Sequence, residues 1–107
     1  MNASYVAKTI YEQIRAGDFA SWFAWGSQSA KVIDEGIIPQ LGFVMGGLSF
    51  TVNGLKFQGI VKVFLMADDT YTVQIGLEGE IFILNETREN IYCDELMFVI
   101  DRLIERD

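Results

Sequence analysis

The segment Leu48-Ser49-Phe50-Thr51-Val52 alternates apolar and polar side chains, and two later segments continue the alternation. They are Ile60-Val61-Lys62-Val63-Phe64-Leu65 and Tyr71-Thr72-Val73-Gln74-Ile75. Because successive side chains of a strand point to opposite faces, a period of two indicates strands with one buried face. Short turn-rich connections separate the segments, so residues 48–75 predict an antiparallel meander.

The first connection of the meander leaves two alternatives. Asn53-Gly54 favours a tight hairpin because both residues tolerate positive φ. Residues 55–59 nevertheless separate this pair from the next alternating segment. We therefore expect either a tight hairpin with a bulge at Gly59 or a longer loop.

Residues 3–16 are predicted to form a helix before the meander. Apolar side chains recur there every four residues and make one stripe, as is typical of an amphipathic helix. This stripe consists of Val6, Ile10 and Ile14. Asn2 or Ser4 is expected to cap the start of the helix, and Gly17 to end it.

Residues 91–106 are predicted to form a second helix at the end of the sequence. Its apolar stripe consists of Leu96, Val99, Ile100 and Leu103, with Ile104 at the edge. Acidic residues are expected in its first turn and basic residues in its last turn, where they complement the helix dipole. They are Asp94 and Glu95 at the start, and Arg102 and Arg106 at the end.

Three further stretches are less regular. Residues 80–84 predict one more strand, because Ile81 and Ile83 would share a face. The aromatic segment 18–26 fits a strand or a helix by its spacing, and the breakers Gly17-Asp18 and Gly26-Ser27 favour a strand. Residues 27–35 fit a short strand or a helical turn, and residues 36–47 fit an edge strand after Pro39 or a mobile flap.

These elements predict an α+β fold and a single domain over residues 1–107. We expect an N-terminal helix, an antiparallel meander sheet of four or five strands and a C-terminal helix, with both helices on one face of the sheet. Residues 60–65 carry apolar side chains at both odd and even positions, so both faces of this strand are apolar. This indicates that the second face of the sheet is also covered. A homodimer is one way to cover it.

Composition excludes several classes of protein. Half of the residues are hydrophobic, so the chain has enough apolar material for a core, yet no apolar run is long enough to span a bilayer. A single cysteine excludes an intramolecular disulfide framework, and the N-terminus lacks the apolar run of a signal peptide. These features favour a cytoplasmic protein with no membrane partner. We assign no cofactor.

The net charge of −7 is unevenly distributed. Residues 1–62 hold four acids and five bases, whereas residues 63–107 hold eleven acids and three bases. A strongly acidic half repels the phosphate backbone, so direct nucleic-acid binding is disfavoured. An acidic mimic of nucleic acid that blocks a host factor is an alternative function.

The order of short motifs along the chain resembles a group of small bacteriophage and mobile-element proteins for which no biochemical activity is established. The motifs are a helix ending near Gly, an aromatic segment closing on Gly, a Leu-x-Phe-x-Val strand, a basic-apolar strand before Asp-Thr-Tyr, and an Ile-Tyr-x-Asp-x-Leu helix. Here they stand at 10–17, 22–26, 48–52, 61–65 with 69–71, and 91–96. The resemblance implies a phage or mobile-element origin and action inside the host cell.

Candidate binding residues lie in two apolar segments. Dense aromatic side chains can anchor a partner or stack on a base, and Trp25 is the member we expect to be exposed. The apolar stretch 37–45 would form an interaction patch if it lies on the surface. The candidate binding residues are Trp22, Trp25, Ile37, Ile38, Leu41, Phe43 and Met45.

Candidate catalytic chemistry is sparse. The sequence has no histidine, so Cys93 has no imidazole to activate it, and we expect a small, partly buried, inert residue. Asp68 and Asp69 are expected to serve the turn, because Asp bonds readily to its own backbone there. A metal-dependent hydrolase would require Asp94 to join them. We assign no catalytic residue and no metal ligand.

Three functions follow, in order of preference. The first is a non-catalytic binding protein of phage or mobile-element origin that acts on a host protein or sequesters a small ligand. The second is the acidic nucleic-acid mimic, and the third is the metal-dependent hydrolase built on clustered carboxylates.

Overall fold

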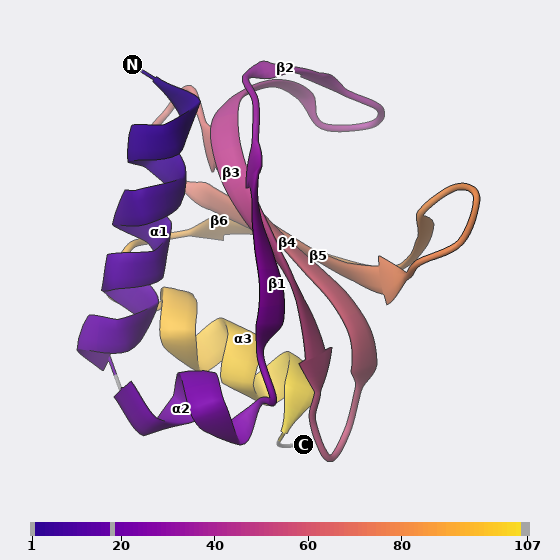
Figure 1. Ribbon diagram of the computed structural model, residues 1–107. Coiled ribbons are helices and arrows are strands. Elements are labelled where there is room, and N and C mark those ends of the chain that lie inside the picture. The colour runs from indigo at the N-terminus through magenta and orange to yellow at the C-terminus, as the bar shows by residue number, and fades with distance from the viewer. Residues whose placement is uncertain (1, 18, 106–107) are drawn as a thin grey trace.

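A computed structural model describes residues 2–17 and 19–105 of the chain and confirms the α+β architecture. An N-terminal helix precedes an antiparallel sheet, and a C-terminal helix packs on the same sheet (Figure 1). The elements are α1 (Ala3–Gly17), α2 (Phe19–Ala24), β1 (Gln28–Ile33), β2 (Gly36–Ile38), β3 (Gly42–Asn53), β4 (Gln58–Met66), β5 (Tyr71–Leu77), β6 (Ile83–Ile91) and α3 (Leu96–Ile104). None of the helices within the described residues is long and apolar enough to cross a membrane.

The sheet contains the predicted meander and extends it. Its strand order is β1-β3-β4-β5-β6, with the short β2 also paired to β3, so over the described residues it has six strands rather than four or five. The alternating segments 48–52, 60–65 and 71–75 form the middles of β3, β4 and β5. Their registers place Leu48 opposite Val63 and Val63 opposite Val73.

One face of the sheet, here called the helix face, carries the core. Its strand residues alternate as the sequence predicts, and they pack with the stripes of α1 and α3 into one cluster. Fully buried members include Ile10, Ile14, Val61, Val63, Val73, Leu96 and Ile100. Burying a side chain of this size is worth about 1.5–3 kcal/mol, so this cluster dominates the stability of the fold.

Helix α1 begins as predicted. The side chain of Asn2 accepts a hydrogen bond from the amide of Tyr5 at 3.1 Å, which identifies Asn2 rather than Ser4 as the N-cap. The stripe of the helix faces the sheet, and Gly46 of β3 lies against Val6 at this contact. Gly46 has φ of +134°, a value that glycine adopts easily.

The prediction of a strand over residues 18–26 is wrong, because this segment forms helix α2. Gly26 has φ of +63° and ends the helix in a Schellman motif. The amide of Gly26 donates to the Phe23 carbonyl oxygen at 2.9 Å, and the amide of Ser27 donates to the Trp22 carbonyl oxygen at 3.4 Å. The glycine that suggested a strand boundary is therefore a helix C-cap. The side chain of Phe19 lies outside the described residues.

The irregular stretch 27–47 forms strand β1, the β2–β3 hairpin and the start of β3. Residues 28–33 are thus a strand and not a helical turn, and the chain after Pro39 turns directly into the long β3. In Figure 1 the β2–β3 hairpin extends from one end of the sheet, and the loop between β5 and β6 projects from another part of it.

The predicted strand 80–84 is displaced, since β6 runs from Ile83 to Ile91. Residues 78–82 form a loop, and Ile81 is exposed. The strand is an edge strand with mostly exposed polar side chains, so it lacks the alternation that marks a half-buried strand.

The β3–β4 connection is the longer loop, and it caps the C-terminus of α3. Asn53 pairs with Gln58, and the amides of Lys56 and Phe57 donate to the carbonyl oxygen of Ile104 at 2.7 and 3.1 Å. These bonds satisfy a carbonyl that a helix end leaves without an intrahelical partner. Gly54 permits this approach, because a Cβ there would lie 2.6 Å from the same oxygen.

Helix α3 is shorter than predicted. Ile91 ends β6, and the turn of residues 93–95 precedes the helix, so Asp94 and Glu95 are not in its first turn. Glu95 instead accepts a hydrogen bond from the amide of Tyr92 at 3.2 Å. Arg102 lies in the last turn as expected, and Arg106 lies outside the described residues.

Candidate functional site

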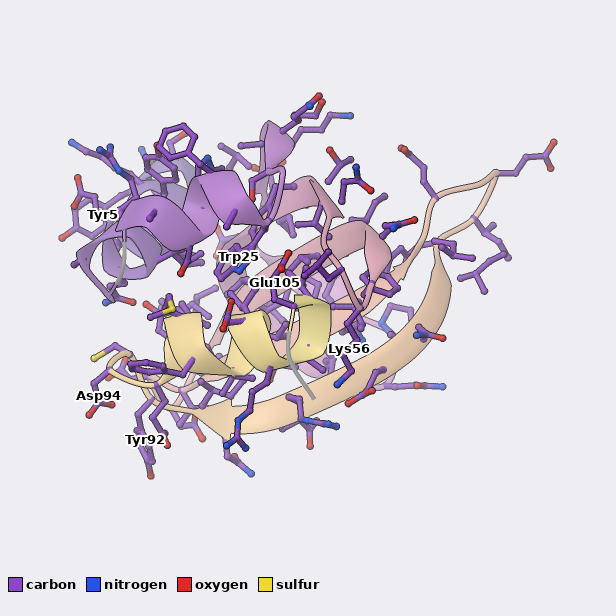
Figure 2. All side chains as sticks on the ribbon, turned by 90° about the horizontal axis from the view of Figure 1, so that it is seen from below. Tyr5, Trp25, Lys56, Tyr92, Asp94 and Glu105 are labelled. Carbon is purple, nitrogen blue, oxygen red and sulfur yellow. The ribbon has the colours of Figure 1, made fainter. Side chains whose placement is uncertain are left out.

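The two tryptophans predicted to bind a partner lie in the core. Trp25 is fully buried, contrary to the expectation that it is exposed, and Trp22 is 8% exposed. Trp25 donates from Nε1 to Oδ1 of Asp101 at 2.9 Å and stacks on Phe50. Figure 2 shows Trp25 on the side of α3 that faces the rest of the molecule. Both indoles therefore hold helices to the sheet and offer no surface to a ligand.

The side chains of the apolar stretch 37–45 lie partly on the surface and partly in the interior. Ile37 and Phe43 are paired across the β2–β3 hairpin, and they are 74% and 48% exposed. Met45 packs against the core cluster. Ile38 and Leu41 are partly buried, and each lines a cavity on the face of the sheet opposite the helices.

The acidic residues considered for metal binding do not meet. Asp68 serves the β4–β5 turn, as expected, since the Thr70 hydroxyl and amide donate to its Oδ1 at 2.7 and 3.1 Å. These hydrogen bonds hold the pKa of the Asp68 carboxyl below its ordinary value. Figure 2 shows Asp94 directed away from the body of the molecule. Within residues 2–17 and 19–105, no three His, Cys, Asp or Glu side chains gather as metal ligands.

Cys93 lies beside Asp94 in the same turn. It is exposed, so the expectation of partial burial is wrong.

The face of the sheet opposite the helices, here called the open face, carries a row of polar side chains. The registers align this row across five strands, from β1 through β3, β4 and β5 to β6. Its members are Lys31, Ser49, Lys62, Gln74 and Thr87. Such a row across a sheet is a platform on which a ligand can make several polar contacts at once.

Two neighbouring segments of the chain partly cover the open face. Phe64 and Val44 are buried but belong to no part of the main core cluster, so this face has a small apolar centre of its own. The β2–β3 hairpin approaches it with Ile38 and Pro39, and the β5–β6 loop with Phe82. The chain itself thus supplies part of the cover expected for this face.

Two adjoining cavities remain on this face, and together they are called the open-face groove. The larger has a volume of about 480 Å³ and is lined by Ile33, Ile38, Phe64, Gln74 and Leu84 among others. The smaller has about 340 Å³ and is lined by Ser29, Lys31, Thr51, Ile60 and Glu78 among others. Ser49, Lys62 and Phe82 line both. These volumes lie in the range of small-molecule sites in proteins.

Phe82 stands at the junction of the two cavities. Its ring lies over Gly76, where a Cβ would come within 2.6 Å of the Phe82 Cζ. Glycine at this position leaves room for the aromatic side chain to fold back over the sheet. The ammonium group of Lys62 lies 3.9 Å from the ring centroid, a cation–π contact.

Lys62 is the charged group at the centre of the groove. It is partly buried between Ser49 and Gln74, and desolvation lowers the pKa of its ammonium group below the ordinary value of 10.5. Within residues 2–17 and 19–105, no carboxylate forms an ion pair with it. The groove therefore presents a positive charge that a cation–π contact stabilises but no anion neutralises.

Of the binding residues predicted from the sequence, only Ile38 lines this groove. Lys62, Phe64 and Phe82 were missed. The sequence contained one indication of this groove. Phe64 lies two residues after Lys62 and therefore points to the same face, which makes the strand apolar on both faces. The contribution of Phe82 depends on a loop that returns over the sheet, which no local pattern indicates.

Comparisons of the chain with protein-family models, with curated proteins and with solved structures found no significant match.

Proposed function

We propose that this protein is a non-catalytic binding protein that sequesters a small ligand in the open-face groove. The observation that supports this most is the pair of adjoining cavities that share Ser49, Lys62 and Phe82. Ligand sites are typically concave, largely apolar and supplied with a few convergent polar groups. The phage or mobile-element origin and the cytoplasm of the host cell, suggested by the sequence, belong to the same proposal.

Sheet geometry favours binding through pre-formed side chains. The polar row is held in register by strand pairing, so its members need little ordering when a ligand arrives. Gln74 is only 6% exposed and is paired with Lys62 across β4 and β5.

A thermal-shift screen of small molecules tests the proposal. A ligand at a concentration of 100 times its Kd stabilises the fold by about 2.7 kcal/mol. For a domain of this size we expect a rise in Tm of roughly 10 °C. Ser49→Tyr fills the centre of the groove and is expected to abolish the shift.

Ser4→Tyr, on the exposed surface of α1, is the matched control and should keep the shift. If no compound stabilises the wild type, or if Ser49→Tyr responds as strongly as the wild type, the groove is not a ligand site.

Binding of a host protein is the second candidate. Ile37 and Phe43 favour it, because they form an exposed apolar pair on the β2–β3 hairpin. Capture from host extract with the wild type and with the Ile37→Ser/Phe43→Ser variant tests it, and a partner retained equally by both would exclude the pair. Size-exclusion chromatography with light scattering distinguishes a host partner from a homodimer.

A further inference from the structure

The charges around the open-face groove differ from those of the whole chain. The protein carries a net charge of −7, yet Lys31 and Lys62 both line the smaller cavity. They belong to the same cross-strand row and are separated by the β3 strand, with Ser49 between them. Adjacent strands lie about 4.8 Å apart, so the backbones of Lys31 and Lys62 are about 9.6 Å apart, a distance that their long side chains can close around one ligand head group.

One carboxylate also lines this cavity. Glu78 lies in the β5–β6 connection at the rim, and its side chain belongs to the smaller cavity and not to the larger. Among the described residues it forms no ion pair with Lys31 or Lys62. The two lysines outnumber this one carboxylate in the lining of the smaller cavity.

The larger cavity supplies an apolar surface directly beside Lys62. Ile38, Phe64 and Leu84 line it, and these side chains come from three different strands. Partial desolvation of an ammonium group without an anionic partner costs free energy, and an anion that binds there offsets this desolvation penalty. Charge at one end and apolar surface at the other select an amphipathic ligand.

We propose that the ligand is a small amphipathic carboxylate, whose head group lies at Lys62 and Ser49 and whose apolar part fills the cavity lined by Ile38, Phe64 and Leu84. This proposal rests on the proposed function and names the chemistry of the ligand. The lowered pKa of Lys62 agrees with it, since a bound carboxylate would stabilise the protonated ammonium group.

Isothermal titration calorimetry with three probes of equal chain length tests the proposal. Decanoate, 1-decanol and decylammonium share an apolar tail and differ in the charge of the head group. We expect decanoate to bind at least tenfold more tightly than either of the others, because a hydrogen bond to a charged group is worth more than a neutral one.

Lys62→Met keeps the length and apolar character of the side chain and removes its charge. It is expected to weaken decanoate binding about tenfold or more and to leave 1-decanol binding unchanged. Lys62→Arg should retain decanoate binding to within about threefold. Lys8→Met, at an exposed lysine on α1, is the matched control and should change nothing.

Glu78→Gln provides an independent variant should Lys62→Met fail to fold. Removing the carboxylate at the rim is expected to strengthen decanoate binding by about twofold to fivefold at low salt. Equal affinities for the three probes, no binding of decanoate, or no effect of either substitution would overturn the carboxylate assignment.

The failure of this assignment is distinct from the failure of the proposed function. If Ser49→Tyr abolishes the binding of some other compound while decanoate shows no preference, the groove is a ligand site of different chemistry. If Ser49→Tyr affects no compound, both proposals fail.

Discussion

Trp25 and Asp101 connect the end of α2 to α3, and the energy of this connection can be measured. The indole of Trp25 is fully buried and donates to Oδ1 of Asp101 at 2.9 Å. The backbone of the same residue accepts a hydrogen bond from the amide of Asn53 at 2.7 Å, which ties it to the end of β3. Replacing Trp25 by Phe keeps the backbone bond and an aromatic ring and removes the indole donor.

The expected loss has two parts. A hydrogen bond to a charged acceptor contributes about 1.5–3 kcal/mol. Removing part of the ring from a packed site adds about 1 kcal/mol through lost contacts and a residual cavity. The free energy of unfolding should therefore fall by about 2.5–4 kcal/mol, which lowers Tm by roughly 10–16 °C in a domain of this size.

A double-mutant cycle isolates the hydrogen bond from the other interactions of Asp101. The variants are Trp25→Phe, Asp101→Ala and the combination, each unfolded in urea and followed by far-UV circular dichroism. We expect a coupling energy of about 1.5–3 kcal/mol. A coupling below about 0.5 kcal/mol, the level expected of independent sites, would refute the role assigned to this contact.

Two further predictions concern the fold. Gly54→Ala places a Cβ against the Ile104 side chain and 2.6 Å from its carbonyl oxygen, so it should displace the loop that caps α3 and destabilise by about 2–4 kcal/mol. Thermal melts of both variants test this. Gly79→Ala is the control, because its Cβ would meet only the Ile81 carbonyl oxygen at 3.4 Å, and it should be nearly neutral. Burial raises the pKa of the Tyr71 hydroxyl above its ordinary value of 10.0. Because the unfolded chain then loses this proton first, stability should fall as pH rises above about 10, and Tyr71→Phe should reduce that fall in urea titrations at pH 9 to about 11. An identical alkaline loss in wild type and variant would show that Tyr71 does not contribute.

The part of the fold that follows from the sequence is the part in which burial imposes a period. Strands β3, β4 and β5 bury one face against helices, and α1 buries one stripe, so each carries its own pattern. The cap at Asn2 and the turn at Asp68 were also predictable, because both use hydrogen bonds between neighbouring residues.

Helix α2 shows why a short segment escapes this reasoning. Trp22 and Trp25 are buried on one side of a helical turn, yet six helical residues are too few to separate a period of 3.6 from a period of two. A glycine such as Gly26 fits a strand boundary as well as the C-terminal end of a helix. Only its φ of +63° in the structure distinguishes the two.

The groove could be predicted only in part. The apolar parity of Phe64 indicated a covered second face, but the identity of the cover depends on the return of the β5–β6 loop. That return requires Gly76 beneath the ring of Phe82, a contact between residues on different elements. The sequence directed attention to Trp22 and Trp25 because aromatic residues serve both cores and binding sites.

The most direct test of the central claim is an NMR titration of the isotopically labelled protein with decanoate. If decanoate binds in the open-face groove, chemical shifts should change together at Ser49, Lys62, Gln74 and Phe82, and the side-chain signals of Lys62 should change with them because the carboxylate binds its ammonium group. Changes confined to α3 or to the exposed pair Ile37 and Phe43, with the signals of Lys62 unmoved, would contradict it.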